Sequence, residues 1–89
     1  MPLYFLADMT WVQVAELARQ TNVALVPTGA TEAHGPHLPL STDVIIALGA
    51  CRRAAERLAA QNILCAIAPP FSYAATNFAR SVPFAGTIT

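Results

Sequence analysis

The sequence predicts an α/β fold, in which a parallel sheet built from a βαβ unit is flanked by helices. Two short apolar runs, residues 23–27 and 63–68, have the length and the β-branched content of buried parallel strands. A helical pattern over residues 43–60 lies between them. Because consecutive strands joined by a helix usually lie side by side and run in the same direction, we expect the two runs to be parallel neighbours.

A shorter helix is predicted before the first strand, over residues 11–19. Thr10 and Gln13 have the spacing of a capping box, and Trp11, Val14 and Leu17 keep a helical period. We expect Asn22 to end this helix. Trp11 is interpreted as an anchor in the core or in an interface, rather than as a ring that contacts substrate.

The longer helix is expected to begin with Ser41 or Thr42 as its cap, which places Asp43 in the first turn. The helix dipole favours an ionised carboxylate there. The pair Gln61 and Asn62 should close the helix. Its apolar stripe is predicted to comprise Val44, Leu48, Cys51, Ala55 and Leu58.

Composition limits both the size and the class of the protein. The chain has 89 residues, of which 55% are hydrophobic and 11% charged, so it is core-rich for a single small domain. We therefore expect residues 1–89 to be an incomplete N-terminal segment of one larger domain. Residues 71–85 lack periodicity and are predicted to form a long functional loop.

Charge and cysteine content exclude several classes of protein. The formal net charge is zero and all five cations are arginine, without a basic stripe, so we expect no nucleic-acid partner and no membrane partner. Cys51 and Cys65 are predicted to be buried thiols in a reducing compartment. Because the sequence has no signal-peptide pattern and no apolar run of spanning length, we expect a cytoplasmic location.

The chemistry-bearing residues gather in one stretch, residues 31–43, which reads TEAHGPHLPLSTD. It follows the first predicted strand, at the sheet edge where α/β proteins bind ligands. On an extended backbone Glu32 and His34 project from the same face, and Asp43 returns from the helix start with two oxygens that could bridge a metal pair. Carboxylate and imidazole suit divalent zinc, manganese or iron.

Spacing alone leaves the metal reading open. A Glu-x-His pair occurs often by chance, and an Asp at a helix start is commonly a simple cap. His37 is interpreted as a residue that contacts the metal ligands without binding the metal, or as a structural residue, rather than as a ligand. Three ligands also fall short of a dinuclear site, because Glu16 and Glu56 are expected on helix surfaces.

Several longer motifs of the sequence resemble those of a known family. The sequence resembles the N-terminal portion of the creatininase (creatinine amidohydrolase) family over nearly its whole length. It departs from the family pattern at Ala30, Ala33 and Ala85, where Gly or Ser, Gln, and Pro respectively are usual. The similar segments are MTW at residues 9–11, VALVPTG at 23–29, TEAHGPHLPLSTD at 31–43, APP at 68–70 and PFAGTI at 83–88.

The resemblance implies a three-layer α/β/α domain with two divalent metal ions, zinc or manganese and possibly iron. It implies that a metal-bound hydroxide hydrolyses a C–N bond of a small amide or cyclic amide, and that the full-length protein is a homo-oligomer. By position, Glu32 resembles the ligand of one ion, His34 that of the other, and Asp43 the bridging carboxylate. The family's remaining ligands and its catalytic histidine would come from sequence after Thr89. The alternative is a non-catalytic fragment or a small α/β binding module with at most one weak metal site.

Overall fold

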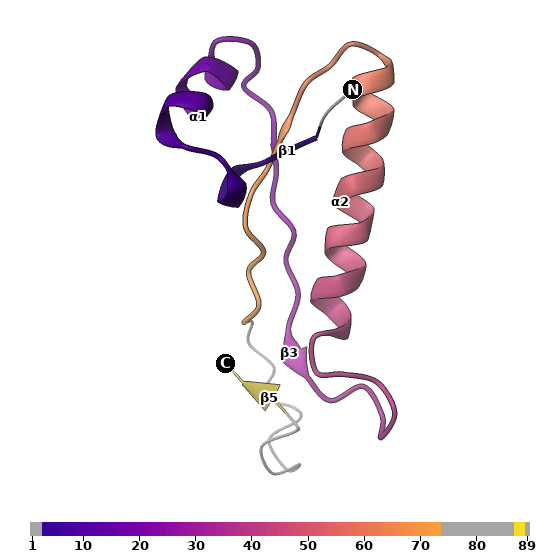
Figure 1. Cartoon of the computed structure of the whole chain (residues 1–89). Helices are drawn as coiled ribbons and strands as arrows, with labels where there is room; N and C mark the ends of the chain where they lie inside the picture. The colour runs from indigo at the N-terminus through magenta and orange to yellow at the C-terminus, as the bar shows by residue number, and fades with distance from the viewer. Residues whose placement is uncertain (1–2, 74–86, 89) are drawn as a thin grey trace.

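The computed structural model describes residues 3–73 and 87–88. Its helices are α1 (Trp11–Ala18) and α2 (Thr42–Ala60), with a short 3-10 helix, η1, at Leu6–Asp8. Its strands are β1 (Tyr4–Phe5), β2 (Ala24–Leu25), β3 (Thr31–Glu32), β4 (Ala66–Ile67) and β5 (Thr87–Ile88). In Figure 1, α2 runs along one side of the strands and α1 lies on the other. The predicted α/β class, with helices that flank a parallel sheet, is confirmed.

The parallel sheet has three strands in the order β1-β4-β2. The predicted βαβ unit is β2-α2-β4, and its two strands are indeed parallel neighbours. The first strand, β1, was not anticipated from the sequence. It pairs in parallel with the other side of β4, and its two residues carry no local pattern that would separate them from the 3-10 helix that follows.

The prediction that residues 23–27 form a buried strand is wrong in one respect. Val23 is 38% exposed and Val26 is 49% exposed, although Pro27 is fully buried. The reason is position, because among the described residues β2 lies at the edge of its sheet, with β4 as its one neighbour. The prediction holds better for β4, the central strand, whose residues Ala66 and Ile67 are buried.

The core lies between α2 and the sheet. Ala55 from the helix packs with Cys65 and Ile67 at β4, and the cluster is extended by half-buried apolar side chains of both layers. The predicted apolar stripe of α2 therefore faces the sheet. The half-buried apolar side chains that pack against this cluster are Leu3, Phe5, Leu25, Cys51 and Leu58.

The N-terminal end of α2 differs from expectation, whereas its C-terminal end agrees with it. Ser41 occupies the N-cap position, but its side chain makes no capping hydrogen bond. The Thr42 hydroxyl instead donates to the Pro39 carbonyl at 2.6 Å, so the predicted hydroxyl cap is wrong. Gln61 ends the helix, and Asn62 has a positive φ of 62°.

Helix α1 begins as predicted. The Gln13 amide donates to the Thr10 hydroxyl at 3.2 Å, and the Thr10 amide donates to the Gln13 side chain at 2.9 Å, which completes the capping box. Trp11 is not an anchor in the core of this chain, because it is 81% exposed, whereas its interpretation as an interface anchor stays a prediction. Leu17 is the buried residue of this helix.

Beyond β2 the chain stays extended and is held to a neighbouring segment. Thr28 forms a parallel bridge with Phe71, in which the Gly29 amide donates to the Phe71 carbonyl at 2.9 Å and the Phe71 amide to the Pro27 carbonyl at 3.0 Å. The Thr31 hydroxyl donates to the Ser72 carbonyl at 2.6 Å. Most of the predicted 71–85 loop lies outside the described residues.

Two further sequence expectations concern cysteines and membranes. Cys65 is buried and Cys51 half-buried, and both are free thiols. Among residues 3–73 and 87–88, neither helix combines the length and the apolar character that crossing a bilayer requires.

Candidate metal centre

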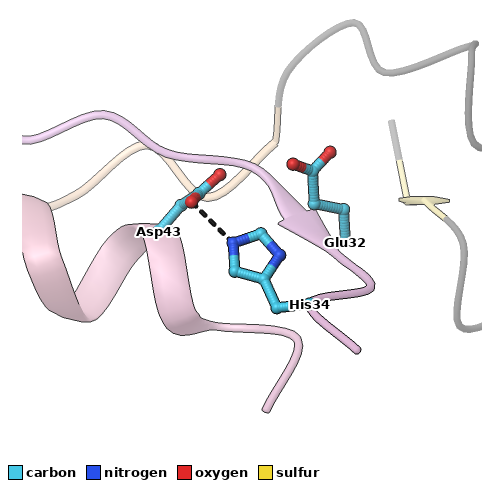
Figure 2. Close-up of side chains that lie close together, drawn as sticks. All are labelled: Glu32, His34 and Asp43. Atoms are coloured by element: carbon cyan, nitrogen blue, oxygen red, sulfur yellow. Dashed lines mark hydrogen bonds and ion pairs between the residues drawn. The ribbon is translucent and has the colours of Figure 1, made fainter. Parts of the chain in front are cut away.

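The centre is built where the chain leaves the sheet and enters α2, beside the small antiparallel sheet of β3 and β5. Glu32 is the last residue of β3, and its amide donates to the Leu40 carbonyl at 3.1 Å. That bond joins the beginning and the end of the loop between β3 and α2. The carboxylate of Glu32 is thereby presented toward the start of the helix (Figure 2).

His34 is positioned by a tight turn. It forms an antiparallel bridge with Leu38, and Gly35 between them has a φ of +74°, which only glycine adopts without strain. The His34 Nδ1 lies 2.7 Å from the Ala33 carbonyl oxygen. This contact sets the orientation of the ring and directs Nε2 toward Asp43.

Asp43 stands in the first turn of α2. Its Oδ1 lies 2.7 Å from Nε2 of His34, and the two side chains are 37% and 19% exposed respectively. One donor atom from each of Glu32, His34 and Asp43 lies within 4.8 Å of the others. Figure 2 shows the three side chains gathered between β3 and α2. The convergence that the sequence spacing predicts is present, while metal ligation itself stays a prediction.

The electrostatics of His34 and Asp43 are those of a hydrogen-bonded ion pair. The hydrogen bond to the Ala33 carbonyl, followed by that to Asp43, raises the pKa of His34 above its ordinary value. The hydrogen bond from His34 lowers the pKa of Asp43, although partial desolvation opposes it. Since both ring nitrogens face acceptors, the protonated imidazole is the form that satisfies both contacts when no ion is bound.

Glu32 gives the strongest sign that the arrangement suits a metal. Its Oε2 is buried and has no hydrogen-bond partner among the described residues. A buried carboxylate oxygen without a partner is costly, and a divalent ion bound there would satisfy it. Metal-binding histidines commonly donate their second nitrogen to a carbonyl, as His34 does to Ala33.

The spacing of the donor atoms also fits. Two ligands of one zinc ion are at most about 4.4 Å apart, since each bond is about 2.0–2.2 Å long. Donor atoms within 4.8 Å of one another therefore need only small side-chain rotations to share an ion. The chemistry of the set, two carboxylates and one imidazole, suits zinc, manganese or iron.

Other sequence candidates lie apart from this group. His37 is exposed at the turn, with its ring beside Gly35, and is not among the converging side chains. Glu16 pairs with Arg19 at 3.5 Å on the surface of α1, and Glu56 is exposed on α2, as expected. A cavity of about 400 Å³ lies between β1, η1 and α1, and none of the three metal candidates lines it.

The sequence interpretation missed the small residues that support the site. The Ala33 carbonyl orients His34, and Ala30, 6% exposed, contributes its backbone amide to the lowered pKa of Asp43. Gly29 lies against the backbone of α2 at Asp43. The sequence feature that could have indicated this support is the presence of three small residues, Gly29, Ala30 and Ala33, close to Glu32.

Comparison with known proteins assigns the chain to a family. Residues 7–89 match the sequence profile of the creatininases, described as creatinine amidohydrolase. The chain belongs to the creatininase family. The expected resemblance is therefore confirmed.

Curated relatives in the family carry several names. The chain is 45% identical over 69 residues to the mycofactocin precursor peptide peptidase of Mycobacterium ulcerans, which covers 73% of this chain and 27% of that protein. It is 37% identical over 57 residues to the creatinine amidohydrolase of Pseudomonas putida, with coverage of 63% and 22%. It is 34% identical over 71 residues to the 3-dehydro-scyllo-inosose hydrolase of Thermotoga maritima, with coverage of 80% and 21%. The chain thus spans about a quarter of the length of these relatives.

Solved structures of creatininases share the fold. A glutamine variant of creatininase described as Zn-Zn type superposes with a TM-score of 0.71 and 28% identity, over 100% of this chain and 34% of that one. A creatininase described with manganese gives a TM-score of 0.66 and 30% identity, over 81% of this chain and 26% of that one. Creatininase structures therefore carry zinc or manganese.

Proposed function

We propose that this chain is the metal-binding N-terminal segment of a single creatininase-like domain that hydrolyses a C–N bond in an amide or a cyclic amide. The observation that carries the proposal is the convergence of two carboxylates and one imidazole, with Glu32 Oε2 buried and without a partner in the described part of the chain. Family membership supports hydrolysis as the class of reaction.

The proposed roles of the residues follow from their positions. Glu32 would hold one divalent ion, His34 would hold a second through Nε2, and Asp43 would contribute its carboxylate to both. The ions, when bound, supply a water of lowered pKa and polarise the carbonyl of the substrate. The Ala33 carbonyl would keep the Nδ1 proton of His34, so that Nε2, which contacts Asp43 Oδ1 in the metal-free structure, would offer its lone pair to an ion.

The remaining ligands and the catalytic residues are proposed to lie outside residues 1–89. The described residues offer three candidate ligands, and two ions with open positions for water and substrate require more. We further propose a small amide as the substrate, zinc or manganese as the metal, a homo-oligomer when full length, and a cytoplasmic location. The two free thiols support the location, and the zero net charge supports a small-molecule partner rather than nucleic acid.

Equilibrium dialysis of the purified chain against zinc or manganese, followed by elemental analysis, tests the proposal. Close to two ions per chain is the expected result for a chain that also carries the ligands proposed to lie outside residues 1–89. A single weakly held ion would favour the alternative, a binding module with one weak site. No bound ion in the wild-type chain would overturn the metal role of Glu32, His34 and Asp43.

A second assay addresses the reaction. A metal-loaded protein that also contains the residues proposed to lie outside 1–89 should open the ring of creatinine or cleave a short peptide amide, and the same preparation treated with EDTA should not. The Glu32→Gln variant is expected to lose this activity, while Glu56→Gln, on the exposed face of α2, should retain it. Equal rates for wild type and the Glu32→Gln variant would contradict the assignment.

A further inference from the structure

The strand that leads into the metal centre approaches the start of α2 unusually closely. A Cβ atom placed on Gly29 would lie 2.8 Å from the Val44 amide nitrogen, 2.9 Å from the Asp43 carbonyl carbon and 2.9 Å from the Asp43 Cβ. Real Cβ atoms essentially never come within 3.0 Å of such neighbours. Any side chain at position 29 therefore requires one of the two segments to move.

Neither neighbour can yield by a simple side-chain rotation. Two of the three atoms that Gly29 would meet belong to the backbone of α2, and the third is the Cβ of Asp43, whose position the backbone sets. A flexible side-chain end could rotate away at little cost, whereas these atoms move only with the first turn of the helix. A side chain at position 29 would therefore displace Asp43 itself.

The segment that carries Gly29 is also restrained on its other side. The Gly29 amide donates to the Phe71 carbonyl at 2.9 Å, and the Phe71 amide donates to the Pro27 carbonyl at 3.0 Å. Pro27 is fully buried, and the Thr31 hydroxyl is bonded to the Ser72 carbonyl at 2.6 Å. Retreat of the segment from α2 would break these bonds, so the helix start is the side that gives way.

We propose that Gly29 is a positioning residue for Asp43. Because Gly29 has no side chain, the start of α2 lies close enough to bring the Asp43 carboxylate together with the side chains of Glu32 and His34. This inference rests on the proposed function. The donor atoms of the three residues lie within 4.8 Å of one another, and the ligands of one ion are at most about 4.4 Å apart. A shift of the first turn by about an ångström away from Glu32 and His34 would therefore take Asp43 out of reach of an ion held by either residue.

The test compares Gly29→Ala with Gly49→Ala, the same change on α2 itself. A Cβ at Gly49 would meet nothing within 4 Å, and alanine is favoured over glycine inside a helix. Isothermal titration of the metal-free proteins with zinc should show the dissociation constant of Gly29→Ala raised about 10- to 100-fold, the range seen when residues that orient ligands are changed. Gly49→Ala should bind zinc within about twofold of wild type.

Val44→Ala separates positioning from general loss of stability. Val44 is a buried residue of the same turn, 8% exposed, and its truncation removes packing without pressing on Asp43. It should lower the melting temperature of the metal-free protein and leave zinc affinity close to wild type. If Gly29→Ala and Val44→Ala weaken zinc binding equally, Gly29 acts on stability alone and the inference is overturned.

The wild-type protein provides a measurement that does not depend on whether the variant folds. Nuclear Overhauser contacts between the Gly29 α-protons and the Asp43 β-protons should be strong, and zinc should shift the Gly29 amide resonance more than that of Gly49. Absence of either effect, in a wild-type chain that binds zinc, overturns the positioning role. A wild-type chain that binds no zinc instead overturns the proposed function, so the two failures are distinguishable.

Discussion

Glu32, unlike His34, is placed for a ligand rather than for the stability of the metal-free fold. The Oε2 atom of Glu32 is buried without a partner among the described residues, whereas His34 has an acceptor at each ring nitrogen. The carboxylate of Glu32 therefore gains most from an added cation. His34 must exchange a proton for the ion, since a metal takes the lone pair of neutral imidazole.

Replacing Glu32 by Gln should weaken metal binding without weakening the metal-free fold. The substitution removes the charge that attracts the ion, and it also removes a buried carboxylate that lacks a partner. We expect the zinc dissociation constant to rise about tenfold or more, while the melting temperature of the metal-free protein is unchanged or higher. Calorimetric titration and thermal circular dichroism measure the two quantities.

Glu56→Gln is the matched control, since it makes the same change on the exposed surface of α2. It should alter neither zinc affinity nor melting temperature. A large drop in the melting temperature of metal-free Glu32→Gln would contradict the view that Glu32 is held at a cost to the fold.

The His34–Asp43 pair should give the metal-free protein a defined pH dependence. The pKa of His34 is raised above 6.5, so its contribution is complete below 6.5 and is lost as pH rises through the raised value. The pKa of Asp43 is lowered below 3.8, so its contribution is complete above 3.8 and is lost as pH falls through the lowered value. Both contributions are therefore complete between pH 3.8 and 6.5.

Urea denaturation of the metal-free wild type and of Asp43→Asn at several pH values tests the direction of this pH dependence. The stability advantage of the wild type should be largest in the mildly acidic window and should shrink toward alkaline pH. An NMR titration should likewise show a lower pKa for His34 in Asp43→Asn than in the wild type. A wild-type advantage that grows as pH rises would refute the pairing.

At the scale of an element, α2 connects the core to the metal centre. Its inner face packs Ala55 against Cys65 and Ile67, and its first turn carries Asp43. The C-terminal end is closed by a residue with left-handed backbone, Asn62, at φ 62°. The two ends are therefore separable, because one positions a ligand and the other only ends the helix.

Substitutions at Asn62 should change stability and leave the metal centre intact. Alanine in the left-handed region costs about 1 kcal/mol, whereas glycine adopts that region freely. We expect Asn62→Ala to lower the free energy of unfolding by about that amount and Asn62→Gly to equal or exceed the wild type. Chemical denaturation measures both, and zinc titration should give wild-type affinity in each variant. Equal stability of the two variants would show that Asn62 does not hold this conformation.

At the scale of the whole molecule, the chain is elongated. Its radius of gyration is 15.9 Å, whereas a compact domain of this length would have about 12 Å. Large apolar side chains remain exposed on both helices and next to the edge strand, among them Trp11 at 81%, Ile46 at 65% and Val26 at 49%. A small core between α2 and one face of the sheet therefore carries the fold, which makes the stability of the chain marginal.

A marginal fold should respond strongly to a ligand that binds only the folded state. The three candidate ligands come from β3, the turn and α2, so an ion would link segments that separate on unfolding. At a zinc concentration about 100 times the dissociation constant, the gain is about 2.7 kcal/mol, or on the order of 10 °C in melting temperature for a domain of this size. Thermal circular dichroism with and without zinc measures the shift.

Removal of the ion with EDTA should reverse the shift, and Asp43→Asn should abolish it. Binding of zinc to the unfolded chain would lower the melting temperature instead, which would speak against a folded site. The same experiment with manganese ranks the two metals.

The sequence by itself determined those features that depend on local pattern. The period of α2, the capping box of Thr10 and Gln13, and the parallel pairing of the two runs all follow from spacing and propensity. The candidate ligands could be named for the same reason, since Glu32, His34 and Asp43 lie within one twelve-residue window and extended spacing places the first two on one face.

The tertiary structure alone decided what depends on contacts between distant segments. Residues 23–27 read as a buried strand, yet β2 is an edge strand, because neighbours and not composition set exposure. The pairing of β1 with β4, the restraint of Gly29 by Phe71, and the approach of Gly29 to Asp43 join residues far apart in the chain. No local preference encodes such contacts, since their free energy arises only when both partners are already in place.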